Sequence, residues 1–390
     1  MNMKCVLVSF FNSHNIGDVI IGDMLYEIVI RHCEVEKLSY TGNLIINPLN
    51  PKDNSNQVYK KRIYDFLIRN KFNKIIDLYY RSVKDDSLGV FEDKIQGVDS
   101  LVIGGGNMIF DLDEKSNSVK RFDDFIKIAK KHNKNIFAIS IGIGPFKTIE
   151  QEIKSINSLS HCNYISFRDK SSLKIFKKHK PDFINAFLTV DPVFLLPNKL
   201  RYKNIKQKVT IGLNIINNRL IDNDQKKYDL IIGGYVKLAE CLTQRLNVKV
   251  VLFCTELNDF QSVLDVYSNL KLNNNVRTAR VKSYEDLILL YEDLSLLIGT
   301  RMHSMIVAYT QEIPVIGLSY QDKVDSMFEI IKSHDYLFNY ENINIDDIIN
   351  CSKNILDNLS EEQHKIKLRL KQIIDKNSIN NEILLKLMNS

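Results

Sequence analysis

The chain has 390 residues, and its 53 Lys and Arg against 47 Asp and Glu give a formal net charge of +6. With 44% hydrophobic and 26% charged residues, the composition is that of a folded globular protein and excludes disordered, collagen-like and disulfide-framework classes. The length predicts two domains. The surplus of positive charge is too small to give any reason to expect nucleic acid as a partner.

The six cysteines lie far apart, with no Cys-x-x-Cys pair and no Cys/His cluster at zinc spacing. They predict buried thiols in a reducing compartment and no metal site. The N-terminal apolar run Cys5–Phe11 is too short to span a membrane, and no small-residue cleavage site follows it. We therefore expect a cytoplasmic protein, whose mildly basic surface still allows peripheral contact with the inner face of a membrane.

Short apolar runs alternate with helix-patterned polar segments along the chain. This alternation predicts mostly parallel sheets wrapped by crossover helices. Ligands of open α/β sheets bind beyond the carboxyl ends of the strands, so we expect the chemistry there. The predicted strands are Cys5–Phe11, Lys74–Leu78, Ser100–Ile103, Ile136–Ile141, Tyr164–Phe167, Val209–Asn214, Val248–Phe253, Leu296–Ile298 and Val315–Leu318.

Two prolines bracket a short apolar run in Asp191–Lys199, and a charged segment follows it. Prolines interrupt helices and central strands, so this segment predicts a domain boundary. We expect an N-terminal α/β domain over residues 1–198 and a smaller α/β domain over 199–335. A helical tail over 336–390 is expected to pack across the domains, and the Asn- and Lys-rich stretch Asn43–Lys61 predicts a surface loop.

Polar residues follow the first predicted strand, where Asn15, Gly17 and Asp18 open an amphipathic segment. Gly17 permits a tight turn, and the first amides of the helix that follows offer donors to an anionic or polyhydroxylated ligand. Asn15 and Asp18 would face that ligand. Both residue types are also favoured helix caps, so the capping role stays open as the alternative.

Glycine runs follow two further predicted strands, at Gly104–Asn107 and at Gly142–Pro145. Each run predicts either a close backbone approach to a ligand, such as an anion-binding nest, or a plain turn between strand and helix. Neither has the spacing of the dinucleotide fingerprint, and the chain contains no Walker-type lysine loop. The sequence therefore gives no support to nicotinamide or nucleoside-triphosphate chemistry.

Arginines stand directly after two predicted strands, at Arg168 and Arg301. A planar guanidinium suits a carboxylate or a phosphate, and His303 adds a group that titrates near neutrality. For each residue alone, a surface ion pair or a core histidine is the alternative. Their combination in Gly299–Ser304 favours a ligand site. Lys323, after a later strand, could meet a phosphate or simply begin a helix in solvent.

The ordered motifs resemble those of the polysaccharide pyruvyl transferase family. The resemblance implies a fold similar to GT-B glycosyltransferases, with two Rossmann-like domains facing across a cleft. It also implies an enzyme that moves the carboxyvinyl unit of phosphoenolpyruvate onto two sugar hydroxyls as a cyclic ketal, in surface polysaccharide or glycoconjugate synthesis. The matching elements are Asn15–Asp18, Gly104–Asn107, Ile141–Pro145, Ser166–Asp169, Asp191–Pro192, Gly299–Ser304 and Tyr320–Lys323.

For the donor, the resemblance implies that Arg168 and Arg301 hold phosphoenolpyruvate, with the Met302 backbone and the His303 side chain beside it. His303 is the expected general acid, and stabilisation of the departing phosphate is its alternative role. The donor site is expected mainly in the C-terminal domain, with Lys323 at its wall. This chemistry implies no metal and no cofactor.

The acceptor is expected to be a sugar or glycan on the N-terminal domain. Whether it is lipid-linked, nucleotide-linked or a finished glycan stays open. Asp18 is expected to hold the sugar or to accept a proton from its hydroxyl. The expected acceptor-binding residues are Asn15, Gly17, Asp18, Gly105, Gly106 and Asn107.

Two rival functions stay open. A GT-B glycosyltransferase would use Arg301 and His303 to contact the diphosphate of a nucleotide sugar, although no clear ribose-binding Glu motif stands around Glu285–Asp293. A non-catalytic sugar-phosphate binding protein would keep its ligand after His303→Ala and release no phosphate.

Overall fold

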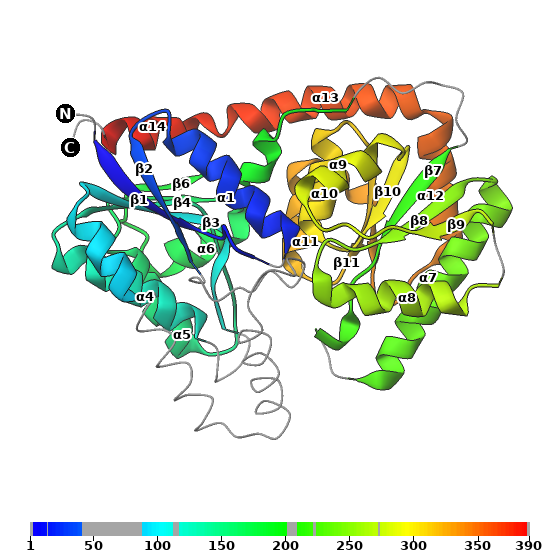
Figure 1. Cartoon of the computed structure of the whole chain (residues 1–390), viewed down its shortest axis with the longest axis horizontal. Coiled ribbons are helices and arrows are strands. Elements are labelled where there is room, and N and C mark those ends of the chain that lie inside the picture. Colours follow the sequence, from blue (N-terminus) through cyan, green and yellow to red (C-terminus); the bar gives the residue numbers. More distant parts are fainter. Residues whose placement is uncertain are drawn as a thin grey trace, which may run out of the picture. The chain divides into compact units, whose positions relative to one another are not determined.

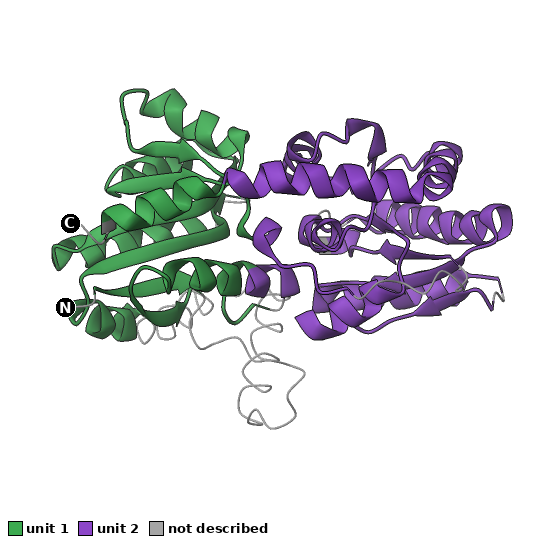
Figure 2. Ribbon diagram, turned by 90° about the horizontal axis from the view of Figure 1, so that it is seen from above, with its two compact units in different colours: residues 1–14, 21–192, 377–390 green, residues 15–20, 193–376 purple. Residues whose placement is uncertain are grey.

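The computed structural model describes residues 3–13, 15–40, 88–111, 117–200, 209–220, 224–271 and 274–387. The predicted strand Lys74–Leu78 and the predicted loop Asn43–Lys61 lie outside these residues. The chain forms two compact units (Figure 2). Unit 1 comprises residues 1–14, 21–192 and 377–390, and unit 2 comprises residues 15–20 and 193–376.

Unit 1 is built on a six-stranded parallel sheet with the order β2-β1-β3-β4-β5-β6. Its amphipathic helices bury apolar residues at three- and four-residue spacing, as α4 does with Phe122, Phe125, Ile126 and Ala129. The strands are β1 (Lys4–Ser9), β2 (Glu34–Ser39), β3 (Ser100–Asp111), β4 (Asn135–Phe146), β5 (Tyr164–Phe167) and β6 (Ala186–Leu188). The helices include α1 (Ile16–Val29), α4 (Ser118–Lys131), α5 (Ile149–Leu159), α6 (Lys170–His179) and α14 (Ser378–Leu387) (Figure 1).

Unit 2 has its own apolar core and its own six-stranded parallel sheet, with the order β12-β11-β10-β7-β8-β9. The strands are β7 (Thr210–Asn214), β8 (Lys249–Phe253), β9 (Val276–Thr278), β10 (Leu296–Gly299), β11 (Val315–Ser319) and β12 (Leu337–Asn339). The helices are α7 (Gln225–Leu246), α8 (Phe260–Asn269), α9 (Tyr284–Glu292), α10 (Met302–Thr310), α11 (Asp322–Ile330), α12 (Ile345–Asp357) and α13 (Leu359–Asp375). The 3-10 turns are η1 (Pro192–Leu195), η2 (Asn218–Leu220), η3 (Leu257–Asp259) and η4 (His334–Tyr336).

Two parallel-sheet α/β units and C-terminal helices confirm the predicted fold class. The units divide between Pro192 and Val193, earlier than the boundary expected after Asn198. The reason is that residues 197–199 bond to unit 2: Lys199 N donates to Gln311 Oε1 at 2.8 Å, and Gln311 Nε2 donates to Pro197 O at 3.2 Å. The segment after residue 335 supplies the strand β12 as well as helices, so it is not a purely helical tail.

The glycine runs do not end their strands, which corrects the sequence expectation. Strands β3 and β4 have 12 residues each and continue through Gly104–Gly106 and Gly142–Gly144. A Cβ on Gly104 would lie 2.0 Å from the Ile139 carbonyl oxygen, and one on Gly105 would lie 2.1 Å from Ile21 of α1. Gly104 and Gly105 therefore let a neighbouring strand and a helix approach closely, and neither run forms the plain turn between strand and helix that was the alternative.

The C-terminal helix α14 belongs to unit 1 through a buried polar side chain. Asn380 is fully buried, and its amide donates to Ser140 Oγ at 2.8 Å and to Asn377 Oδ1 at 2.6 Å. Its oxygen accepts from Ser166 Oγ at 2.6 Å. Because Ser140 lies on β4 and Ser166 on β5, these bonds hold α14 against the sheet of unit 1.

Among the described helices, none has the length and apolar character needed to cross a membrane.

Candidate functional site

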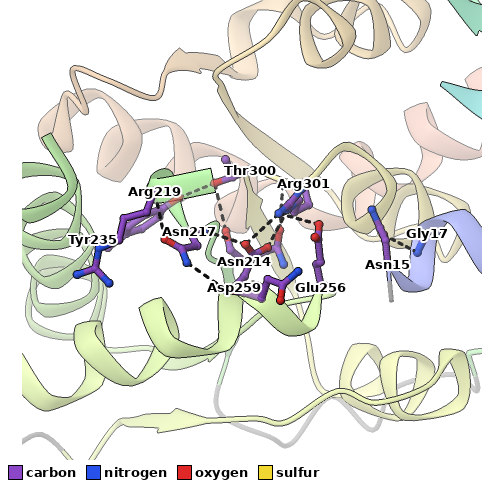
Figure 3. A network of polar contacts seen from close by, with 11 residues as sticks. Asn15, Gly17, Asn214, Asn217, Arg219, Tyr235, Glu256, Asp259, Thr300 and Arg301 are labelled. Atoms are coloured by element: carbon purple, nitrogen blue, oxygen red, sulfur yellow. Dashed lines mark hydrogen bonds and ion pairs between the residues drawn. The ribbon is translucent and has the colours of Figure 1, made fainter. Parts of the chain in front are cut away.

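The candidate site of unit 2 lies at the carboxyl edge of its sheet, beyond the neighbouring parallel strands β10, β7 and β8. Parallel strands end at one edge, so the loops after them meet there. Arg301 follows β10, Asn214 ends β7, and Glu256 and Asp259 follow β8. Figure 3 shows these four side chains within one network of polar contacts.

Arg301 is held by two carboxylates. Its Nε and Nη2 donate to the two oxygens of Asp259 at 2.8 and 2.9 Å, and Nη2 also lies 2.8 Å from Glu256 Oε2. Burial alone would lower the pKa of the Arg301 guanidinium, but the hydrogen bonds to Asp259 and the charges of Asp259 and Glu256 outweigh it and raise this pKa above its ordinary value. Arg301 is therefore a permanent cation held in a fixed orientation.

Asp259 is fully buried, and its Oδ1 accepts a second bond, from Asn217 N at 2.9 Å. A buried carboxylate needs such partners, because water cannot reach it. The backbone of Arg301 is fixed as well, since Arg301 N donates to Asn214 Oδ1 at 3.0 Å. Thr300, bonded to Tyr235, donates to the Asn214 carbonyl at 3.2 Å (Figure 3).

Glu256 is the more exposed carboxylate of the pair, with 19% of its side chain accessible. Burial raises the pKa of the Glu256 carboxyl above its ordinary value, the charge of Arg301 opposes this rise, and the charges of Asp259 and Asp18 add to it. The carboxyl group is therefore easier to protonate than an ordinary glutamate.

The first turn of α1 belongs to this site, although the sequence predicted it for the N-terminal domain. Residues 15–20 group with unit 2. Ile16 N donates to Thr255 O at 3.1 Å, and Asn15 forms an antiparallel bridge with Glu256. Asn15 Oδ1 accepts from Gly17 N at 2.9 Å, so Asn15 takes the capping role that the sequence left open, and Asp18 lies further into the helix.

His303 lies in the first turn of α10, packed against the first turn of α1. A Cβ on Gly17 would lie 2.4 Å from His303 Cβ and 2.5 Å from Nδ1. Gly17 is therefore needed to make room for the histidine, and not for a tight turn as expected. The nearest oxygen of Asp18 lies 4.0 Å from His303 Nδ1, and the two side chains are 25% and 12% exposed.

Arg168 belongs to unit 1, where it follows β5. Its side chain is buried, its Nη1 donates to Asp191 Oδ2 at 2.8 Å, and its Nε lies 3.7 Å from Asp169 Oδ2. Asp169 also caps α6 by accepting from Ser172 N at 2.7 Å. Gly142 on β4 leaves the space that the guanidinium fills, since a Cβ there would lie 2.7 Å from Nε.

The remaining predicted residues have local partners. Met302 is buried at the start of α10, and the Lys323 ammonium lies 5.5 Å from the ring centroid of Tyr320. Asn107 Nδ2 donates to the Gly144 carbonyl at 2.7 Å, which joins β3 to β4.

Within unit 2 the structure brings Asn15, Gly17, Asp18, Arg301, Met302 and His303 to one edge, and Lys323 follows β11 in the same unit. Arg168, Gly105, Gly106 and Asn107 lie in unit 1. Sequence reasoning missed Glu256 and Asp259 as the partners of Arg301. Both follow the predicted strand Val248–Phe253, so extending the strand-end argument to that loop could have found them.

Each unit repeats a parallel sheet with helical crossovers, which makes the fold GT-B-like. Solved structures with a similar fold include a UDP co-structure of MnaA from S. aureus (TM-score 0.56, 10% identity, 99% of this chain and 98% of that one) and the UDP-GlcNAc 2-epimerase from Methanocaldococcus jannaschii (TM-score 0.55, 12% identity, 90% and 92%). A glycosyltransferase from Rickettsia africae is similar as well (TM-score 0.54, 13% identity, 99% and 96%).

The sequence decides the family within this fold. The model of the polysaccharide pyruvyl transferases matches residues 15–322, so the chain belongs to the polysaccharide pyruvyl transferase family. The matched range includes the first turn of α1 and both arginines. No curated protein sequence matches the chain significantly.

Proposed function

We propose that the protein transfers the carboxyvinyl unit of phosphoenolpyruvate to two hydroxyls of a sugar, forming a pyruvate ketal and releasing phosphate. The observation that carries this proposal is the family match over residues 15–322. The product would serve surface polysaccharide or glycoconjugate synthesis, and the acceptor would be a sugar or glycan on a lipid, a nucleotide or a finished chain.

The two arginines are the proposed donor-binding residues. Phosphoenolpyruvate carries a carboxylate and a phosphate, and guanidinium groups suit both. The bonds of Arg301 to Asp259 and Glu256 use Nε and Nη2, so among the described residues none of its ion pairs takes Nη1. We assign Nη1 to the donor, with Asp259 fixing the direction in which it points.

His303 is the proposed general acid. It protonates the methylene carbon of the donor, one sugar hydroxyl adds to the cationic carbon next to it, and that hydroxyl loses its proton to a base. A second hydroxyl then attacks the same carbon as the carbon–oxygen bond to phosphate breaks, and its proton leaves with phosphate or water. This scheme needs no metal and no cofactor.

The first test is binding of phosphoenolpyruvate, measured by calorimetry and thermal shift beside UDP and UDP-sugars. A ligand at about a hundred times its dissociation constant stabilises the fold by about 2.7 kcal/mol, which a melting curve resolves. We expect a response to phosphoenolpyruvate that Arg301→Ala weakens by about 2–5 kcal/mol. Arg168→Ala is expected to weaken it likewise.

The second test is turnover on a panel of lipid-linked and nucleotide-linked sugars, followed by phosphate release and by the mass of the product. Phosphate release coupled to ketal formation supports the proposal. A response to nucleotides alone, with transfer from a nucleotide sugar, would replace it with a glycosyltransferase. Donor binding that survives His303→Ala without any phosphate release from the wild type would indicate a binding protein.

A further inference from the structure

We propose that Asp18 is a positioning residue that holds the Nδ1 side of the His303 imidazole and so presents Nε2 to the donor. The inference deepens the proposed function and rests on it for the chemical role of His303. It gives Asp18 a partner within the protein, in place of a direct contact with the sugar.

The position of Asp18 is fixed by a closed ring of contacts within unit 2. The backbone of Asn15 and Ile16 is bonded to Thr255 and Glu256. Glu256 binds Arg301 at 2.8 Å, and Arg301 directly precedes α10, which carries His303. The His303 side chain in turn packs against Gly17 at the start of α1, and Asp18 is the next residue. The backbone bonds, the ion pair and the packing of His303 on Gly17 hold the first turn of α1 against the first turn of α10, and Asp18 lies in that turn.

Gly17 makes this approach sterically feasible. His303 Cβ, Nδ1 and Cγ all lie within 2.6 Å of the point where a Gly17 side chain would begin. The imidazole therefore lies directly against the helix backbone, with its Nδ1 edge toward the turn that carries Asp18. The 4.0 Å distance between Asp18 Oδ1 and Nδ1 is that of an ion pair and longer than a hydrogen bond. Catalytic hydrogen bonds often shorten once substrate is bound.

The contact between Asp18 and His303 decides which imidazole nitrogen carries the proton. An imidazole that donates a proton from Nε2 must keep its other proton on Nδ1, and a carboxylate facing Nδ1 favours that arrangement. After His303 has protonated the methylene carbon, it remains as the neutral tautomer with hydrogen on Nδ1. Asp18 stabilises this tautomer and holds the ring in the orientation needed for the next turnover.

¹⁵N NMR of the imidazole nitrogens measures the tautomer of His303 directly. The spectra are recorded at alkaline pH, where histidines are neutral. The chain has 8 histidines, and His303→Gln assigns the signal. We expect hydrogen on Nδ1 in the wild type. Asp18→Asn should shift the population toward hydrogen on Nε2, because an amide can donate to Nδ1, and Asp18→Glu should restore the wild-type state.

Asp23→Asn is the matched control, since Asp23 lies on the same helix and pairs with Lys37 at the surface. It should leave the His303 signals unchanged. In turnover, Asp18→Asn should lower kcat by about 10²- to 10⁴-fold, the range of a general acid's contribution, with the affinity for phosphoenolpyruvate kept. Melting curves check that each variant is folded.

An unchanged His303 tautomer in a folded Asp18→Asn protein would overturn the proposal and leave Asp18 as a residue that favours the start of its helix. The NMR readout needs no substrate. If the tautomer shifts as expected but the wild type never consumes phosphoenolpyruvate, the positioning role stands and the proposed function fails.

Discussion

Arg301 makes a bidentate ion pair with Asp259, a carboxylate whose side chain is fully buried. The sequence pointed to Arg301 as a ligand-binding residue, and the structure shows that two of its three guanidinium nitrogens already have partners within the protein. A cation held in this way keeps its orientation when no ligand is bound. The Asp259 carboxylate is therefore as much part of the site as the arginine.

Asp259→Asn should lower the free energy of unfolding by about 3–5 kcal/mol, because it leaves the buried Arg301 charge without its main partner. Asp293→Asn is the control, since Asp293 pairs with Arg277 where both side chains are about half exposed. Its effect should stay within about 1 kcal/mol. Chemical denaturation of the two variants measures both values, and equal losses would contradict the role given to Asp259.

Gly17→Ala should disturb the site, because the added methyl would lie 2.4 Å from His303 Cβ. Overpacking of this kind costs about 1–3 kcal/mol, and the displaced imidazole should reduce turnover. Gly233→Ala on α7 is the matched control, since nothing lies within 4 Å of the added atom. There the loss of glycine in a helix should stabilise the protein by about 0.5–1 kcal/mol. The same sign of change in both variants would argue against the steric role of Gly17.

Asn380→Ala should destabilise unit 1, because it removes the partner of the Ser140 and Ser166 hydroxyls in a buried place. An unsatisfied buried group costs about 1–3 kcal/mol. Glu382→Ala, at an exposed position of the same helix, should have little effect. Hydrogen exchange of the β4 and β5 amides measures the change where it is expected, and unaltered protection there would contradict it.

Glu256→Gln should change how stability depends on pH. Because the pKa of Glu256 is raised in the folded protein, the folded state binds this proton more tightly than the unfolded state does. The stability that this proton contributes is present below the ordinary glutamate pKa of about 4.3 and is lost as pH rises through the higher folded value. The stability of the wild type relative to Glu256→Gln should therefore fall with rising pH in that window. Denaturation curves at several pH values measure it, and a relative stability that rises with pH would show that the Arg301 ion pair dominates instead.

The central strands of both sheets were predictable, because strands buried on both faces form continuous apolar runs. The strands that sequence reasoning missed among the described residues are β2, β6, β9 and β12, and each lies at an edge of its sheet. Strand β2 carries Glu34, Glu36 and Lys37 and is largely exposed. An edge strand has one neighbour and more contact with water, so it lacks the apolar run that the prediction used.

The candidate site was predictable only in part, because some of its residues meet only through strands that are neighbours in space. Arg301, His303 and Asp18 were recognised as residues that follow strands. The pairing of Arg301 with Asp259 depends on β10, β7 and β8 being neighbours in space although they are not consecutive in sequence. The position of the first turn of α1 in unit 2 likewise depends on backbone bonds to residues more than two hundred positions away. A single amino-acid sequence carries no signal for such pairings.

Unit 1 contains β1 near the beginning of the chain and Asn380 near its end. As the chain emerges from the ribosome, unit 2 has all of its residues once position 376 has left the exit tunnel, whereas unit 1 still lacks α14. The Ser140 and Ser166 hydroxyls have no Asn380 to bond until all of unit 2 has been synthesised. We therefore expect the N-terminal unit to be the later of the two to reach its final packing during translation, against the usual order in which the first domain made is the first to fold.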